Sequence, residues 1–116
     1  MNIVVFGSMN MDLVSRLPRL PAPGETLRGS DFFTVPGGKG ANQAAACARL
    51  GAITCMIGRV GGDVFGSSLR VSLENLGVDV TGVTTSPGPS VVAVIIVDDC
   101  GENSIVIIPG ANGKVG

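Results

Sequence analysis

The sequence predicts an α/β fold in which helices cover a parallel β-sheet and a small second β-sheet is attached to it. From residue 41 to residue 84, segments of helical period alternate with short apolar runs, which is typical of a parallel sheet with crossover helices. Beyond residue 90 the pattern changes to two apolar runs on either side of a turn, which favours a β-hairpin. A chain of 116 residues with 45% hydrophobic content can bury a core.

The first third of the chain is predicted to contain three strands. Residues 3–6 are β-branched or aromatic and end at Gly7, which indicates a buried strand at the centre of the sheet. Residues 13–17 and 26–35 favour two more strands, which the turn-rich segment 18–24 separates.

Two helices and two more strands are predicted next. Alanines at positions 41, 44, 45 and 48 recur at helical spacing, and Gly51 is placed to end this helix after Leu50. Residues 53–57 form the following strand, and residues 80–84 favour another after the second helix. Asp63 is placed to cap that second helix, which begins near residue 65 and ends at Gly77. The helix is expected to bury Phe65, Leu69, Leu73 and Leu76.

Residues 91–97 and 104–108 form the predicted hairpin, with acidic residues in a solvated turn between them. The first of these strands is apolar at odd and even positions alike, so both of its faces should be covered. We expect a ligand against one face and a second subunit against the other. The predicted elements leave an open sheet edge and exposed apolar faces, so the chain is expected to be the first part of a larger domain.

Composition argues against several functional classes. A net charge of -1 and four aromatic residues predict neither a basic surface nor a stacking platform for nucleic acid. Three cysteines without CxxC spacing, in a chain without histidine, argue against a zinc site or a disulfide framework. The apolar runs are too short for a membrane span and the N-terminus lacks signal-peptide features, so we expect a cytoplasmic protein. Its partners should be small molecules or another copy of itself.

Residues 36–44, PGGKGANQA, carry the strongest functional signal, because a glycine-rich turn, a lysine and an asparagine meet at a helix start. Lys39 opposes the helix dipole in the first turn, which stability alone would not select. Neither GxxxxGK[ST] nor GxGxxG occurs in this segment. A turn that serves packing alone remains the alternative, although Lys39 and Asn42 favour ligand binding.

Asn10 and Asp12 form a second candidate site. They lie just beyond the carboxyl end of the first predicted strand, where ligands bind in open parallel sheets. An ionised carboxylate can accept hydrogen bonds from two adjacent hydroxyls, so Asp12 suits a vicinal diol. The structural alternative is an Asx-turn or a cap at the strand end.

Five short motifs follow one another along the chain: GSMNMD at 7–12, PGET at 23–26, GGKGANQA at 37–44, GEN at 101–103 and GAN at 110–112. In this order they closely resemble ribokinases, which belong to the phosphofructokinase B (pfkB) family of carbohydrate kinases. The resemblance extends through essentially the whole chain.

The resemblance implies an α/β core, at about residues 1–10 and 37–88, and a β-sheet lid, at about 11–36 and 89–110. It implies transfer of the ATP γ-phosphoryl group to D-ribose with Mg²⁺, and a K⁺ site. Lids of this kind also form the contact of a homodimer. The matching sugar-binding positions are Asn10, Asp12, Gly38, Lys39, Asn42, Ala93 and Ile107.

Two departures from the family pattern limit what this chain can do. Ser90-Val91-Val92 stands where ribokinases commonly have Thr-Gly before the lid alanine. The GAGD-type motif with the catalytic aspartate is absent, so the general base is not in this chain and we expect no phosphoryl transfer by these residues alone. The family's nucleotide and cation sites are expected mostly beyond residue 116. Another sugar or nucleoside kinase of the family, or a non-catalytic module for sugar binding or dimerisation, remains an alternative.

Overall fold

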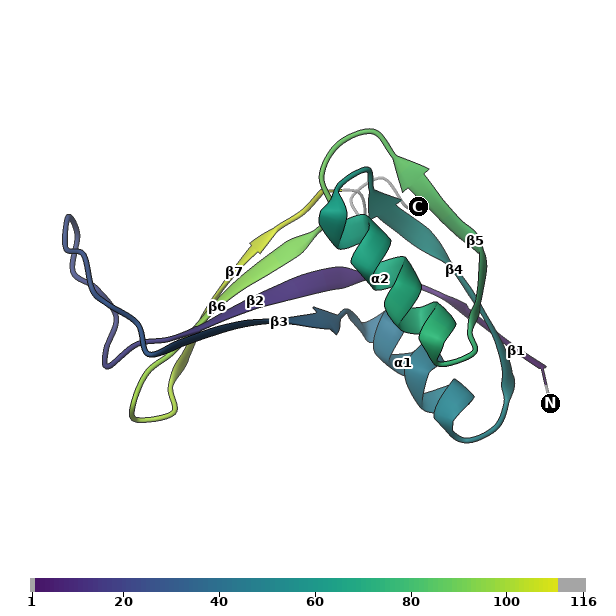
Figure 1. The fold of residues 1–116 in the computed structure, drawn as a ribbon, viewed down its shortest axis with the longest axis horizontal. Coiled ribbons are helices and arrows are strands. Elements are labelled where there is room, and N and C mark those ends of the chain that lie inside the picture. Colours follow the sequence, from purple (N-terminus) through teal and green to yellow (C-terminus); the bar gives the residue numbers. More distant parts are fainter. Residues whose placement is uncertain (1, 111–116) are drawn as a thin grey trace.

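The computed structural model describes residues 2–110, which form two β-sheets and two helices (Figure 1). The GAN motif therefore lies partly outside the described residues. The first sheet has the strand order β1-β4-β5, and all its strands run parallel: β1 (Asn2–Phe6), β4 (Ile53–Gly61) and β5 (Asp79–Ser86). Helices α1 (Lys39–Arg49) and α2 (Val64–Asn75) are the crossovers between these strands. The predicted parallel sheet with crossover helices is confirmed.

Both helices lie against one face of this sheet, where the core is found (Figure 1). The alternating residues Thr54, Met56 and Val60 of β4 point into the core. Leu69 and Leu73 of α2 are buried as predicted, whereas Phe65 and Leu76 are half-buried at the rim of the core. The helices end as expected, because Gly51 and Gly77 follow them with φ of 90° and 86°, values that favour glycine.

Within residues 2–110, the strand predicted at residues 3–6 does not lie at the centre of the sheet. Strand β1 lies at an edge of the three-stranded sheet, and β4 occupies the centre. The outward side chains Val4 and Phe6 are 64% and 65% exposed because the helices cover the opposite face. A fully apolar strand indicates that both faces will be covered, but within residues 2–110 one face of β1 is open.

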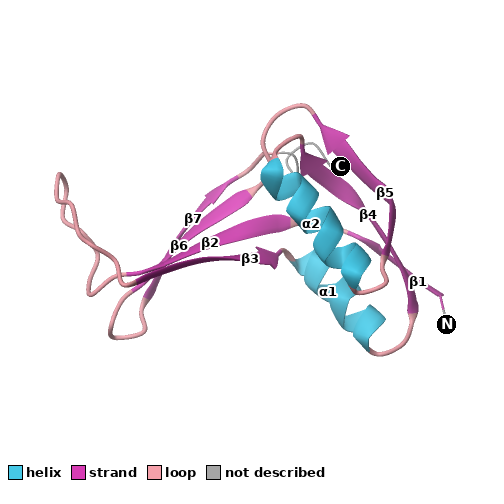
Figure 2. Cartoon of the chain, viewed as in Figure 1, coloured by secondary structure: helices cyan, strands magenta, loops and turns pink. Residues whose placement is uncertain are grey.

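The second sheet has four strands in the order β3-β2-β6-β7 and extends away from the helices (Figure 2). Its strands are β2 (Asn10–Arg16), β3 (Asp31–Gly37), β6 (Val92–Val97) and β7 (Asn103–Ile108). The predicted hairpin of β6 and β7 is confirmed, but it is not an isolated ribbon, because β6 also pairs in parallel with β2. That pairing joins segments about 80 residues apart in sequence, so local patterns could not reveal it.

Several strand boundaries differ from the predictions, most of all the starts of β2 and β3 and the end of β4, which extends to Gly61 rather than residue 57. Strand β2 begins at Asn10 rather than residue 13, because its first residues pair with the end of β3 and with β6. Strand β3 begins at Asp31 rather than residue 26, because Arg16 pairs with Asp31 and the intervening residues 17–30 leave the sheet as a loop. Asn10 and Asp12 therefore lie within a strand, not in a turn after β1.

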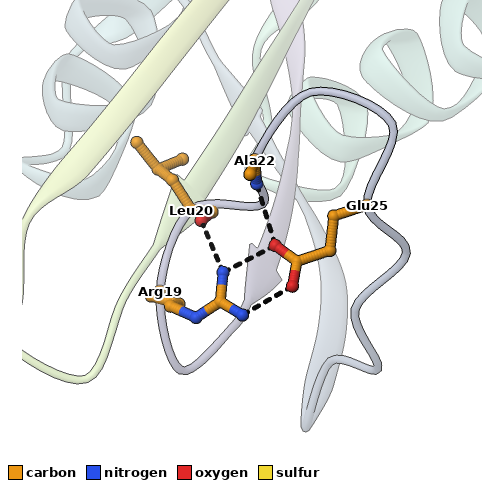
Figure 3. Close-up of polar contacts among 4 residues, drawn as sticks. All are labelled: Arg19, Leu20, Ala22 and Glu25. Atoms are coloured by element: carbon orange, nitrogen blue, oxygen red, sulfur yellow. Dashed lines mark hydrogen bonds and ion pairs between the residues drawn. The ribbon is translucent and has the colours of Figure 1, made fainter.

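The loop between β2 and β3 is closed by an exposed ion pair (Figure 3). Both terminal nitrogens of the Arg19 guanidinium donate to the Glu25 carboxylate at 2.6 Å, and the Ala22 N–H donates to the same carboxylate at 2.9 Å. The Arg19 guanidinium also reaches the Leu20 carbonyl at 3.3 Å. The hydrogen bonds from Arg19 and Ala22 lower the pKa of Glu25 to about 2.

Replacing Arg19 by glutamine should raise the pKa of Glu25 toward its ordinary value of 4.5, measured by NMR titration of the carboxyl carbon. Because the folded-state pKa is depressed, any stabilisation by this pair is present above pH 4.5 and is lost as the pH falls toward 2. The pair is solvent-exposed, so we expect little change in the free energy of unfolding. Arg28→Gln in the same loop is the control. An unchanged Glu25 titration in Arg19→Gln would contradict the assignment.

Within residues 2–110, neither helix is long and apolar enough to cross a membrane.

Candidate functional site

The candidate site begins with two polar side chains on one face of β2. Asn10 and Asp12 alternate with Met9 and Met11, which are buried in the core, so the polar pair faces the other way. The Asn10 amide donates to Asp12 Oδ1 at 2.6 Å. Partial burial raises the pKa of Asp12, and the hydrogen bond from Asn10 opposes that effect. The pair is therefore a preorganised acceptor set, with one carboxylate oxygen already oriented by the amide.

Two glycines at the end of β3 allow the backbone to approach this pair closely. Gly37 is the register partner of Asn10, and a Cβ on Gly37 would lie 2.9 Å from Asp12 Oδ2. A Cβ on Gly38 would lie 2.7 Å from the Ser8 carbonyl oxygen and 2.9 Å from Asn10 Oδ1. Gly38 also has φ of 97°, which side chains rarely allow. Gly38 is therefore needed both for its conformation and for its lack of a side chain, while a side chain at Gly37 would displace the Asp12 carboxylate.

Two lid positions named by the resemblance lie in one row with Asp12. Asp12 is the register partner of Ala93 on β6, and Ala93 is the register partner of Ile107 on β7. Side chains of directly opposed residues lie on the same face of a sheet, so these three share the Asn10 face. Ala93 is buried, whereas Ile107 is 65% exposed at the edge of the sheet. The row thus combines one carboxylate with apolar neighbours.

Lys39 and Asn42 stand at the start of α1, next to the glycine pair in sequence. The helix start is tied to the segment before β2, because the Ala41 N–H donates to the Ser8 carbonyl at 3.0 Å. Both side chains are exposed, and neither is hydrogen-bonded or ion-paired to another of the described residues. Asn42 also borders a groove of about 350 Å³ between α1 and α2, which Arg49 and Ser72 line as well.

The described residues thus bring five of the predicted positions together: Asn10, Asp12, Gly38, Ala93 and Ile107. Lys39 is adjacent to them through the chain, while among the described residues no hydrogen bond joins the Asn42 side chain to the Asn10–Asp12 pair. The place of Gly37 against the Asp12 carboxylate was not predicted. The alternation of polar and apolar residues from Ser8 to Asp12 is a strand signal that could have put Asn10 and Asp12 on one face, but it carries no information about Gly37.

Comparison with known proteins identifies the family. The model of the pfkB family of carbohydrate kinases matches residues 1–115. This chain belongs to the pfkB family. The residues that carry the predicted site in this pfkB chain all lie within the matched range. The predicted resemblance to this family is confirmed.

Individual relatives of this pfkB chain are sugar kinases. A ribokinase of Lactococcus lactis is 48% identical over 114 residues, which cover 97% of this chain and 38% of that protein. A deoxyribokinase of Salmonella typhimurium is 42% identical over 113 residues, which cover 97% of this chain and 37% of the relative. The chain therefore spans less than two fifths of the length of either relative.

A solved structure of Arabidopsis thaliana ribokinase complexed with ribose and ATP superposes with a TM-score of 0.90 at 40% identity. The match covers 95% of this pfkB chain and 36% of the plant protein. The predicted fold class, an α/β core with a parallel sheet and a second small sheet, is thereby confirmed.

Proposed function

We propose that this chain forms the sugar-binding part of an ATP-dependent kinase that phosphorylates D-ribose. The observation that carries the proposal is the Asn10–Asp12 pair, held against two glycines and beside Ala93 on the neighbouring strand. The ribokinase relatives, and the plant ribokinase with ribose and ATP, support ribose as the acceptor.

The polar pair suits a vicinal diol. Asp12 has two carboxylate oxygens, and the Asn10 amide donates to one of them. The remaining acceptor capacity can take two adjacent sugar hydroxyls, while the Asn10 amide oxygen accepts a third. Burial strengthens these hydrogen bonds because the local dielectric is lower than in water. We assign Ala93 and Ile107 to apolar contact with the sugar ring and Lys39 and Asn42 to further polar contacts.

We propose that the four-stranded sheet is the lid of this site. The division places the core at about residues 1–10 and 37–88 and the lid at about 11–36 and 89–110. The Asn10–Asp12 pair lies at the root of that sheet, next to the start of α1. Movement of the lid on the core would therefore open and close the sugar site.

ATP is the proposed phosphoryl donor, with Mg²⁺ and K⁺ as the proposed ions. Within residues 2–110 no three acidic, cysteine or histidine side chains cluster to hold a metal ion, so we assign neither ion to a residue of this chain. Mg²⁺, where bound, neutralises phosphate charge during transfer. The base for the attacking sugar hydroxyl is expected on residues beyond this chain, since no GAGD motif occurs here.

The test is phosphorylation of ribose by the purified full-length kinase that contains this chain. Product formation with ATP should be faster with ribose than with 2-deoxyribose or adenosine, compared by kcat/KM. The Salmonella deoxyribokinase makes 2-deoxyribose the second candidate substrate. Because 2-deoxyribose lacks one hydroxyl of the vicinal diol, a preference for it would argue against the role given to Asp12. Activity with a nucleoside but not with a sugar would overturn the proposal.

We further propose a homodimer through the four-stranded sheet. The edge strand β7 exposes four consecutive apolar side chains, Ile105 to Ile108, each 47–65% accessible. Val106 lies on the face opposite Asp12, so Val106→Glu should shift the protein toward monomer in sedimentation velocity at micromolar concentration. Leu50→Glu, at an apolar position away from that sheet, is the control. A wild-type monomer at this concentration would contradict the dimer.

A further inference from the structure

Ser90, a buried serine between the two sheets, makes three hydrogen bonds to the end of β4 and to the residue that caps α2. Ser90 lies in the segment that leaves β5 and enters β6, and it is 1% exposed. Its hydroxyl donates to Asp63 Oδ1 at 2.8 Å and accepts from the Gly61 N–H at 2.9 Å. Its own N–H donates to Asp63 Oδ2 at 2.9 Å. We name the set of Gly61, Asp63 and Ser90 the Ser90 clasp.

Asp63 both caps α2 and binds the linker that contains Ser90. As predicted, it caps α2, since its Oδ1 accepts from the Gly66 N–H at 2.9 Å. The same carboxylate also binds the linker through the two hydrogen bonds from Ser90. Although burial opposes ionisation, the hydrogen bonds from Ser90 and Gly66 lower the pKa of Asp63. A helix cap needs only one of these bonds, so the others serve the linker.

The backbones at the clasp are packed without room for side chains. A Cβ on Gly61 would lie 2.1 Å from the Ser90 nitrogen, and a Cβ on Gly66 would lie 2.0 Å from the Gly61 carbonyl oxygen. A further hydrogen bond joins the Gly62 N–H to the Gly88 carbonyl at 3.0 Å. The end of β4, the start of α2 and the linker are therefore held in close backbone contact.

The clasp lies immediately before the strand that borders the Asn10–Asp12 pair. The Val91 carbonyl accepts from the Met11 N–H at 3.0 Å, and two residues later Ala93 is the register partner of Asp12. The position of Ser90 thus determines where β6 leaves the core and how Ala93 meets Asp12. Ala93 lies only three residues after Ser90, so a shift of Ser90 would also shift Ala93 relative to Asp12.

We propose that Ser90 and Asp63 are positioning residues for sugar binding, which act by holding the root of β6 so that Ala93 stays beside Asp12. The inference rests on the proposed sugar-kinase function.

The test compares three variants of the full-length kinase. Ser90→Ala removes the hydroxyl, whereas Ser90→Thr keeps a hydroxyl at this position. Asp63→Asn keeps a good helix cap but replaces one carboxylate oxygen with an amide that cannot accept from the Ser90 N–H. Ser86→Ala is the matched control, because Ser86 is also buried, four residues earlier, and its hydroxyl has no hydrogen-bond partner among the described residues.

We expect Ser90→Ala and Asp63→Asn to raise KM for ribose about tenfold, the effect of one lost hydrogen bond, with KM for ATP unchanged. Exchange of the Met11 amide hydrogen, measured by NMR, should be faster in both variants because its acceptor is Val91. Ser90→Thr and Ser86→Ala should resemble the wild type. Kinetics are measured below the thermal transition of each variant, and Asp63→Asn carries the test should Ser90→Ala not fold.

The inference is overturned if KM for ribose stays within about twofold of wild type, or if KM for ATP rises equally, since either result indicates a role in stability alone. Absence of sugar phosphorylation by the wild type would instead overturn the proposed function. In that case amide exchange at Met11 still reports whether the clasp holds β6.

Discussion

Replacing Asp12 by alanine in the full-length kinase is expected to raise KM for ribose about 100-fold or more, because two charge-assisted hydrogen bonds to the sugar are lost. Asp12→Asn should give a similar loss, since it retains the shape of the side chain but not its charge. The measurement is ATP-dependent phosphorylation over a range of ribose concentrations, together with calorimetric titration of ribose.

The fold should survive both Asp12 substitutions. Partial burial raises the pKa of Asp12, which means that the folded protein disfavours the charged form of this side chain relative to the neutral form. Removing the charge also removes this desolvation cost, so we do not expect the substitutions to lower the free energy of unfolding. Asp31→Asn is the control, because Asp31 is exposed and lies at the opposite end of the β2–β3 pair. A wild-type KM in Asp12→Ala would refute the proposed role.

Gly38→Ala is expected to lower the free energy of unfolding by at least about 3 kcal/mol, which sums the cost of a glycine-only backbone conformation and the cost of a steric clash. Gly38 has φ of 97° and ψ of 142°, and a Cβ there would meet the Ser8 carbonyl at 2.7 Å. The measurement is urea denaturation at constant protein concentration, with the midpoint and slope fitted separately.

Gly24→Ala separates the two contributions to this loss. Gly24 also has a positive φ, of 78°, but a Cβ on Gly24 would have no neighbouring atom within 4 Å. The substitution should therefore cost only the conformational part, about 1–2 kcal/mol. If Gly24→Ala and Gly38→Ala proved equally costly, the close approach of Gly38 to Ser8 and Asn10 would have no energetic role.

Elements whose signals are local were predictable from sequence. The alanine spacing and the glycines at 51 and 77 identified both crossover helices, and Asp63 was recognised as a helix cap. The hairpin of β6 and β7 followed from two apolar runs around a turn. In each case a short segment contains all the information, because helix periods, caps and tight turns depend on residues that are near one another in the chain.

Elements that depend on distant partners were not predictable. Nothing local to residues 10–12 indicates that β6 will pair with them, yet this pairing extends β2 to Asn10 and puts Ala93 beside Asp12. Likewise, nothing local to these strands indicates that β4 lies between β1 and β5. Strand order is a property of the assembled sheet, and hydrophobic period does not encode it.

Composition, spacing and motif were enough to establish the elements, the family resemblance and the residue types that suit a sugar. Three features emerged only from the folded chain: the Asn10 amide donates to Asp12, Gly37 and Gly38 lie against this pair, and Ser90 joins the linker to Asp63. A binding site is a set of distances between segments that are remote in sequence. Those distances arise when strand pairing and core packing bring the segments together.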